Sequence, residues 1–234
     1  MKFAYLIEPP FNHRDSDGTV TGSDVELARH VLAELGHAFE PVEAEFAELL
    51  PGLAAGRWQM TTGLFATEER KTVALFSTRI WALPDGFLVR RGNPEGISSY
   101  AALSGRDLRI AVIRDQIQHH AVAASGLAHD NVLVFDTYEA AAEAVATGKA
   151  DAYASVARAH IGYLALHPGL DLDVVTVAAA EKPPAKGAFG FALGDTALRD
   201  AVDDVLAAFI GTPQHRAVMH RFGFTNAEID LLLE

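Results

Sequence analysis

Thr67 and Arg70 are the residues whose types and spacing first suggest binding chemistry. They lie three positions apart in GLFATEERKTVALFS, residues 63–77, with two acidic residues between them. A guanidinium carries a planar set of donors that matches a carboxylate in two parallel hydrogen bonds. The backbone N–H groups at a helix start also favour an anion. The stretch therefore predicts either a clamp for a carboxylate or a solvated helix start in which Arg70 pairs with Glu68 or Glu69.

Motifs for other chemistry are missing from the sequence. The chain has no cysteine, which excludes disulfides, thiol nucleophiles and cysteine-based metal sites. Its ten histidines show no HExxH or HxH spacing, and the adjacent His119 and His120 would point about 100° apart on a helix. The sequence also lacks a GxSxG elbow, a P-loop and a GxGxxG motif after the first expected strand. We therefore expect neither a metal site nor a cofactor.

Composition and charge limit the partners of the protein. The chain has 234 residues, of which 50% are hydrophobic, so it can bury a core in one large domain or two small ones. Its formal net charge of −12 argues against nucleic acids and anionic membranes. No apolar run approaches the ~18 residues that a membrane span requires. The start, MKFAYLIEPPF, lacks the features of a signal peptide, so we expect either a cytosolic protein or a mature form with an added Met.

Strands and helices are expected to alternate along the chain, which is typical of α/β folds with parallel strands. A buried strand is expected at residues 3–7. The helix that follows should begin with a capping box of Ser23 and Glu26 and end before Gly36. Further strands are expected at residues 58–62, 86–94, 108–113, 132–135, 151–154, 172–177 and 188–193, and further helices at residues 47–55, 116–125, 138–147, 156–167, 197–210 and 226–233.

Two breaks in composition divide the chain into three segments. One lies near residues 86–94, and the other is EKPPAKG, residues 181–187. We therefore expect an α/β fold of two lobes. Lobe 1 comprises residues 1–86 and 188–234, and lobe 2, residues 91–180, is inserted into it. A cleft between two such lobes is a natural ligand site.

Motifs along nearly the whole chain resemble a known family. The segments EPPFN, DGTVTGSDVELARHVLAELG, LLPGLAAGRWQMTTGLFATEERKTVALFS, LSGRDLRIAVIRD, GKADAYAS and GFALGDTALRDAVDDVLAAF have the order and spacing of the type 2 periplasmic solute-binding proteins of polar amino-acid ABC importers. The resemblance implies a type II Venus-flytrap fold whose lobes close about hinge crossovers at about residues 83–90 and 178–187. Trp81 is expected to pack near the first crossover.

The same resemblance implies a function. The protein would be a periplasmic monomer that binds a small carboxylated, nitrogen-containing solute, such as an amino acid or a derivative, and delivers it to the membrane permease of an ABC importer. The resemblance assigns the binding of the ligand's carboxylate to Arg70, supported by Thr62 and the backbone of Gly63. Phe46 matches a stacking aromatic and either forms one wall of the site or fills the core. Phe65 replaces a usual Ser or Thr, so it either packs against the ligand's apolar part or fills the core.

Other departures from the family pattern suggest a ligand that is not a plain L-α-amino acid. Glu8 replaces a usual aromatic residue, and it either accepts a cationic group or turns to solvent. Ser155 stands where many members carry the Asp that binds the α-ammonium, and a hydroxyl cannot neutralise that charge. Asp115 and Gln116 replace the Gly and Thr of a carboxylate-binding loop, where Asp115 would repel a carboxylate. The ligand therefore lacks an α-ammonium, or Glu8 or Asp115 replaces the missing anchor.

Two alternative functions stay open. Cyclohexadienyl dehydratases share the expected fold and need an acid poised by burial, a role for which Glu8 is a candidate. However, DAYASVARAH, residues 151–160, has no Glu in the stretch where those enzymes carry their catalytic acid. The second alternative is a ligand sensor, either stand-alone or part of a receptor; receptor sensors are tethered by membrane spans, for which this sequence shows no signal.

Overall fold

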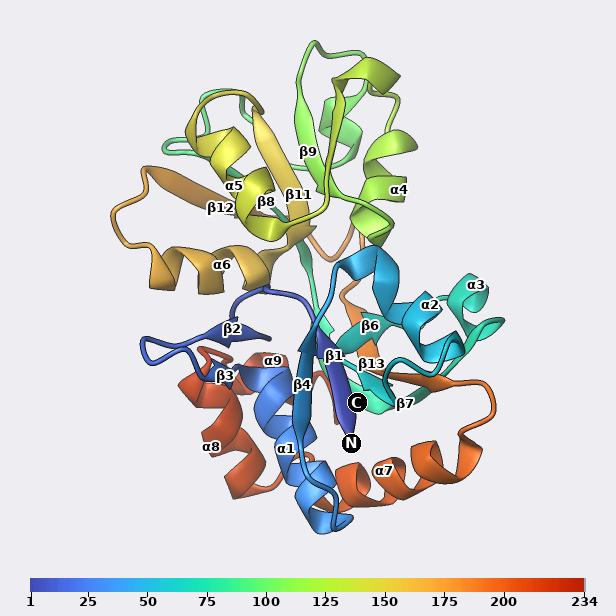
Figure 1. Cartoon of the computed structure of the whole chain (residues 1–234). Coiled ribbons are helices and arrows are strands. Elements are labelled where there is room, and N and C mark those ends of the chain that lie inside the picture. The colour runs from blue at the N-terminus through green and yellow to red at the C-terminus, as the bar shows by residue number, and fades with distance from the viewer. Residues whose placement is uncertain (234) are drawn as a thin grey trace. The chain divides into compact units, whose positions relative to one another are not determined.

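The computed structural model describes residues 1–233, which form two compact units (Figure 1). Unit 1 combines Met1–Ala82 with the described residues from Ala185 onward, and unit 2 is Leu83–Pro184. Unit 2 is therefore an insertion in unit 1, and the chain crosses between the units twice. Both units contain sheets with helices packed against them, which confirms the predicted α/β class.

Unit 1 is built around small sheets. The first is parallel with the order β4-β1-β5, where β1 is Lys2–Tyr5, β4 is Glu40–Glu43 and β5 is Met60–Thr61. The second has the order β6-β13-β7, formed by Gly63–Phe65, Ala185–Ala192 and Ala74–Leu83. Strands β2 (His13–Arg14) and β3 (Val20–Thr21) pair antiparallel. The helices are α1 (Ser23–Glu34), α2 (Leu49–Ala54), α3 (Glu68–Lys71), α7 (Thr196–Phe209), α8 (Pro213–Arg221) and α9 (Asn226–Asp230), with a 3₁₀ helix at Phe46–Glu48.

Helix α1 begins differently from the prediction. Gly22, with φ 136°, is its N-cap, and no side chain caps the helix, so the predicted capping box of Ser23 and Glu26 is wrong. The first two N–H groups of the helix instead donate to the carbonyl oxygens of Pro10 and Phe11, at 2.9 and 3.1 Å. Gly22 permits this contact because a Cβ there would lie 2.0 Å from the Phe11 carbonyl oxygen. The loop that follows β1 therefore packs directly on the start of α1.

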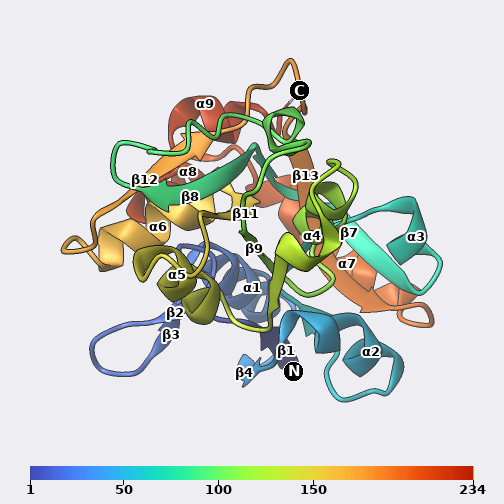
Figure 2. The same ribbon diagram turned by 90° about the horizontal axis from the view of Figure 1, so that it is seen from above.

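Unit 2 contains one mixed sheet with the order β10-β9-β11-β8-β12 in its described residues. Strand β9 (Ile110–Ile113) is parallel to β10 (Val132–Phe135) and β11 (Ala152–Val156), whereas β8 (Asp85–Arg90) is antiparallel to β11 and β12 (Leu172–Thr176). Helices α5 (Tyr138–Ala146) and α6 (Ala157–Leu166) cover one face of this sheet, and α4 (Ile117–Ala123) covers the other (Figure 2). Short 3₁₀ helices lie at Ala101–Leu103 and His129–Asn131.

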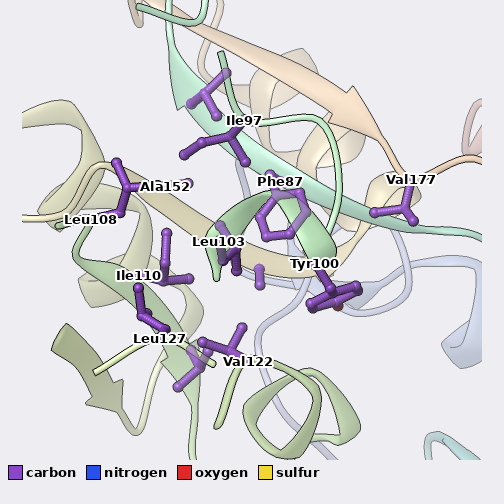
Figure 3. Packing of buried hydrophobic residues seen from close by; sticks show 13 residues of the cluster. Phe87, Ile97, Tyr100, Leu103, Leu108, Ile110, Val122, Leu127, Ala152 and Val177 are labelled. Atoms are coloured by element: carbon purple, nitrogen blue, oxygen red, sulfur yellow. The ribbon is translucent and has the colours of Figure 1, made fainter. Parts of the chain in front are cut away.

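One core cluster of unit 2 lies on the α4 side of the sheet. Figure 3 shows its apolar side chains, which come from the strands, from α4, from the segment between β8 and β9 and from the residue after β12; they include Phe87, Ile97, Tyr100, Leu103, Ile110, Val122 and Val177. The cluster therefore packs both α4 and the segment that follows β8 against the sheet. In residues 1–233, no helix is long and apolar enough to cross a membrane.

Candidate functional site

The loop after β1 places Glu8 in a tight turn. The peptide bond between Pro9 and Pro10 is cis. The carbonyl oxygen of Glu8 accepts hydrogen bonds from the N–H groups of Phe11 and Asn12, at 3.0 and 3.1 Å, and the Glu8 N–H donates to the Asn12 carbonyl at 2.9 Å. Glu8 is only 9% exposed. Its carboxylate is therefore held on unit 1 by a compact loop rather than extended into solvent on a flexible segment.

Asp24, in the first turn of α1, connects this loop to the strands of unit 1. Its side chain is fully buried. One carboxylate oxygen accepts hydrogen bonds from the Thr62 hydroxyl and the Gly63 N–H, both at 2.8 Å, and the other accepts from the Trp81 indole at 3.1 Å. Burial raises the pKa of Asp24 to about 6, and the hydrogen bonds oppose this shift. The donors predicted to support Arg70, on Thr62 and Gly63, are thus directed at Asp24.

The hydrogen bonds of Asp24 also determine how the Asn12 amide is oriented. Because the Thr62 hydroxyl gives its proton to Asp24, its oxygen accepts from Asn12 Nδ2, at 2.8 Å. Asn12 Oδ1 must then face the other way. It is buried and has no hydrogen-bond partner within residues 1–233. Leaving a buried acceptor without a donor costs about 1–3 kcal/mol of stability. An N–H or O–H group that donates to this oxygen would remove that cost.

Arg70 lies on α3, and the predicted helix start at Thr67 is confirmed. Thr67 is the N-cap, and its hydroxyl oxygen accepts from the Arg70 N–H at 3.2 Å. Arg70 Nη1 donates to the Phe65 carbonyl at 3.1 Å, and the guanidinium carbon lies 5.1 Å from the centre of the Phe46 ring. Glu68, one of the two acidic partners expected for Arg70 in a solvated helix start, instead pairs with Lys71 at 2.6 Å. The aromatic face and the carbonyl hold the Arg70 guanidinium in place on unit 1.

Aromatic side chains lie between Arg70 and the Glu8 loop. The Phe65 ring meets Trp81 edge to face, with 5.1 Å between ring centres, and the Phe11 ring centre lies 5.7 Å from that of the same indole. Phe65 and Phe46 are both half-buried. Phe46 packs against the core cluster that contains Leu6 and Leu64. Unit 1 thus brings all six of its predicted site residues into one connected region: Glu8, Phe46, Thr62, Gly63, Phe65 and Arg70.

The three remaining predicted residues lie in unit 2, at the start of α4 and on β11. Asp115 has a positive φ of 62°, a conformation that Asp tolerates and Gly adopts freely. Gln116 is the N-cap of α4 and is buried. Its Oε1 accepts from the hydroxyl of the buried Ser155, at 3.5 Å. Unit 2 therefore joins Gln116 and Ser155 directly, with Asp115 exposed beside them.

Two central residues of this region have no role in the sequence prediction. Asp24 and Asn12 both occur within the motifs that carry the family resemblance, but neither has a spacing that indicates chemistry. Only the fold shows that one carboxylate holds Thr62, Gly63 and Trp81 together. In residues 1–233, no group of three or more His, Asp or Glu side chains has the arrangement of a metal site.

The comparisons with known proteins agree on one family. The model for bacterial extracellular solute-binding proteins, family 3, matches residues 2–225. A probable amino-acid ABC transporter periplasmic-binding protein of Sinorhizobium fredii is 30% identical over 229 residues, which cover 93% of this chain and 74% of the relative. An arginine-binding protein of Corynebacterium glutamicum is 29% identical over 156 residues, covering 63% of this chain and 50% of the relative.

Solved structures share the fold. EhuB in complex with hydroxyectoine has a TM-score of 0.88 and 24% identity, and the match covers 99% of this chain and 90% of that one. An ancestral arginine-binding protein bound to arginine has a TM-score of 0.84 and 21% identity, with 95% and 97% covered. At these sequence identities, the similarity is evidence for the fold alone.

Proposed function

Because the chain belongs to the bacterial extracellular solute-binding proteins of family 3, we propose that its ligand is a small zwitterion with one carboxylate and one delocalised, N–H-bearing cation. The family match confirms the predicted two-lobed α/β fold and the role as the solute-binding component of an ABC importer for amino-acid-like solutes. Members of this family work with membrane permeases.

Arg70 is the proposed anchor for the carboxylate. Its guanidinium lies over the Phe46 ring, and one of its nitrogens is fixed by the Phe65 carbonyl. A guanidinium oriented in this way loses little conformational freedom when it binds a carboxylate with two hydrogen bonds. Phe46 and Phe65 would line the apolar side of the ligand.

Glu8 and Asn12 are the proposed partners of the cation, and their pairing in one loop is the observation that carries the proposal. A buried carboxylate and a buried amide oxygen without a donor stand four residues apart in a turn closed by backbone hydrogen bonds. An amidinium or guanidinium offers N–H donors in more than one direction together with a positive charge, which suits both acceptors. Ser155, which replaces the usual ammonium anchor, and Gln116 add hydrogen bonds but no charge.

Hydroxyectoine and arginine are the two candidate ligands named by similar proteins. Both carry a carboxylate and a delocalised cation. Hydroxyectoine is favoured, because its amidinium is part of a ring and it has no free α-ammonium, in agreement with Ser155 at the position of the usual acidic anchor. Arginine would need a further acid for its α-ammonium, and Asp115 is the candidate.

The proposal extends to motion and location. The two units would close on the ligand by hinge motion at residues 83–90 and 178–187, as two-domain binding proteins do. The mature protein would act in the periplasm as a monomer without enzymatic activity. The relatives reported above are binding proteins, which supports the last point.

Calorimetric titration with hydroxyectoine, L-arginine and L-glutamine tests the proposed ligand class. We expect hydroxyectoine to bind most tightly to the wild type. Arg70→Ala should weaken binding by about 30-fold or more, because removing one partner of a desolvated charge pair costs about 2 kcal/mol or more. Glu8→Gln should lower the affinity for ligands with a delocalised cation and leave the affinity for L-glutamine unchanged.

Arg57→Ala is the matched control for this experiment. Arg57 also belongs to unit 1, lies 4.4 Å over an aromatic ring, that of Trp58, and pairs with Glu48 at 3.0 Å. Its removal should leave the affinity unchanged. Equal affinity of wild type and Arg70→Ala would eliminate the clamp, and tightest binding of L-glutamine would eliminate the role of Glu8. Turnover of prephenate or arogenate would favour the enzyme alternative.

A further inference from the structure

A buried carboxylate in unit 2 lies outside the candidate site but collects donors from three other segments. Asp85 is the first residue of β8 and is 2% exposed. One of its oxygens accepts from Gln118 Nε2 at 2.8 Å, and the other accepts from the Tyr100 hydroxyl at 2.7 Å and forms an ion pair with Lys182. A buried charge is stable only when it is paired and hydrogen-bonded, and Asp85 meets this requirement through partners far apart in sequence.

The partners of Asp85 are themselves held in place. Lys182 Nζ lies 5.1 Å from the centre of the Tyr100 ring. Burial, reinforced by the nearby charge of Asp85, raises the pKa of Tyr100, so the phenol stays protonated and donates. Glu181, beside Lys182, accepts from the Ala101 N–H at 3.2 Å. The cluster of Asp85, Tyr100, Gln118 and Lys182 is therefore a fixed arrangement rather than a loose surface pair.

This cluster lies next to the two residues of unit 2, Gln116 and Ser155, to which we assign a role at the ligand. Gln118 is on the first turn of α4, two residues after Gln116, and no side chain caps this helix. The hydrogen bond from Gln118 to Asp85 thus fixes the helix start from outside. Ser155 pairs with Gly86 across β11 and β8, directly beside Asp85. Both ends of the contact between Gln116 and Ser155 are therefore held by Asp85 or its neighbour.

The same carboxylate lies where the chain enters and leaves unit 2. Asp85 is the third residue after the first crossing, and its carbonyl accepts from the Val177 N–H at 2.9 Å. Lys182 belongs to the segment that leads to the second crossing. Asp85 therefore connects the start of α4 to the chain segments beside both crossings.

We propose that Asp85 is a positioning residue for ligand binding: it sets Gln116 and Ser155 in their binding geometry and ties that geometry to both chain crossings. The inference rests on the proposed roles of Gln116 and Ser155 at the ligand. A carboxylate is needed because an amide in its place has a single acceptor oxygen and cannot neutralise the ammonium of Lys182.

Asp85→Asn, compared with Asp151→Asn, tests this role. Asp151 is also an acceptor in unit 2, with 10% side-chain exposure, and it receives hydrogen bonds from the Arg109 backbone and guanidinium at 2.8 and 3.1 Å. Both variants should lower the melting temperature. Only Asp85→Asn should raise the dissociation constant for hydroxyectoine, or for L-arginine if that binds better, by about tenfold, the equivalent of one hydrogen bond to a charged group. Stopped-flow measurement should place this change in the dissociation rate.

Measurements are made well below both melting temperatures, so that a purely structural role would leave the affinity unchanged. If Asp85→Asn does not fold, Lys182→Met serves instead, since Lys182 is partly exposed, and Lys182→Arg should restore the affinity by keeping the charge. Binding that responds to Arg70→Ala but changes less than twofold in Asp85→Asn or Lys182→Met overturns the inference alone. Failure of the wild type to bind either probe overturns the proposed ligand class and this inference with it.

Discussion

Asp24 shows how one side chain shapes the candidate site without being assigned to the ligand. Its carboxylate receives the Thr62 hydroxyl, the Gly63 N–H and the Trp81 indole. Through Thr62 it also orients the Asn12 amide. Since burial raises its pKa to about 6, it takes up a proton in mildly acidic solution. A protonated Asp24 accepts fewer hydrogen bonds, so the arrangement described here belongs to the ionised form.

Asp24→Asn should remove a pH-dependent contribution to stability. The pKa of Asp24 is about 6 in the folded protein and about 3.9 in the unfolded chain. The folded state therefore binds the proton more tightly, and this contribution is fully present below about pH 4. It is lost as the pH rises to about 6, by about 3 kcal/mol in total. Urea unfolding of wild type and variant between pH 4 and 7.5 should give a difference in unfolding free energy that changes across this window.

The test relies on the difference in unfolding free energy between wild type and Asp24→Asn, because two buried histidines change the stability with pH in the opposite direction. Burial lowers the pKa of His160 to about 3 and that of His215 to about 4. Each therefore adds stability above pH 6.5 that is lost as the pH falls. Both are present in the wild type and in the variant, so their effects cancel in the difference. A difference that stays flat from pH 4 to 7.5 would show that Asp24 titrates normally.

Residue types and spacing drew attention to some residues of the candidate site but not to others. Arg70 and Thr67 stand out because a guanidinium three residues after an N-cap has a recognisable pattern, and the helix start is confirmed. Asn12 and Asp24 do not stand out, because their importance comes from a hydrogen-bond chain that runs from the loop to Thr62, between β5 and β6, and on to α1. Such chains depend on tertiary packing and leave no periodic signal in the sequence.

The packing of strands β6, β13 and β7 likewise depends on tertiary contacts that the sequence pattern does not reveal. Glycines on two of these strands make room for Trp81 on the third: a Cβ on Gly187 would lie 2.0 Å from the indole, and one on Gly63 would lie 2.8 Å from it. The indole fills this space and reaches Asp24. The sheet is thus adapted to one large side chain, and that side chain supports the region around Phe65.

Gly187→Ala should destabilise unit 1 by about 1–3 kcal/mol, because the added methyl group overpacks a site that the indole already fills. Gly169→Ala is the control, since nothing lies within 4 Å of a Cβ at that position and its φ is not in the left-handed region. It should change the unfolding free energy by no more than about 0.5 kcal/mol. Urea unfolding measures both variants. Equal effects of the two substitutions would mean that the Trp81 packing is looser than described.

The sequence predicted most elements but not all of their pairings. The expected strand at residues 132–135 and the expected helices at residues 138–147 and 156–167 agree with β10, α5 and α6 within two residues. Strand β4 was not predicted, because EPVE lacks an apolar alternation and owes its conformation to pairing with β1. The parallel arrangement predicted for the sheets fails at β8, which runs antiparallel to both neighbours.

The charge of the whole molecule fits the proposed ligand class. A formal net charge of −12 repels anions at long range, whereas a zwitterion carries no net charge and approaches freely. In the proposed complex, the positive charge of Arg70 would act on the ligand's carboxylate only at short distance. The two breaks in composition indicated an inserted segment, but nothing in the sequence indicated that Asp85 joins side chains from the segments beside both crossings.

Ligand binding should make the whole molecule more compact. A compact chain of this length has a radius of gyration of about 17.5 Å, and we expect the ligand-free protein to exceed this value. Small-angle X-ray scattering should show a decrease when hydroxyectoine, or the best ligand from the titration, is added to saturation. Arg70→Ala at the same ligand concentration should show no decrease. An unchanged radius for the ligand-bound wild type would argue against hinge closure.

The packing of Trp81 against Gly63 and Gly187 also bears on how related sequences can diverge. These three positions cannot vary independently. A side chain at position 63 or 187 is accommodated best where the residue at 81 is smaller. Either change alone is unfavourable, because a larger residue at 63 or 187 overpacks the indole, whereas a smaller residue at 81 leaves a cavity. Substitutions at these positions should therefore appear together in related sequences, and the packing of Phe65 against residue 81 would change along with them.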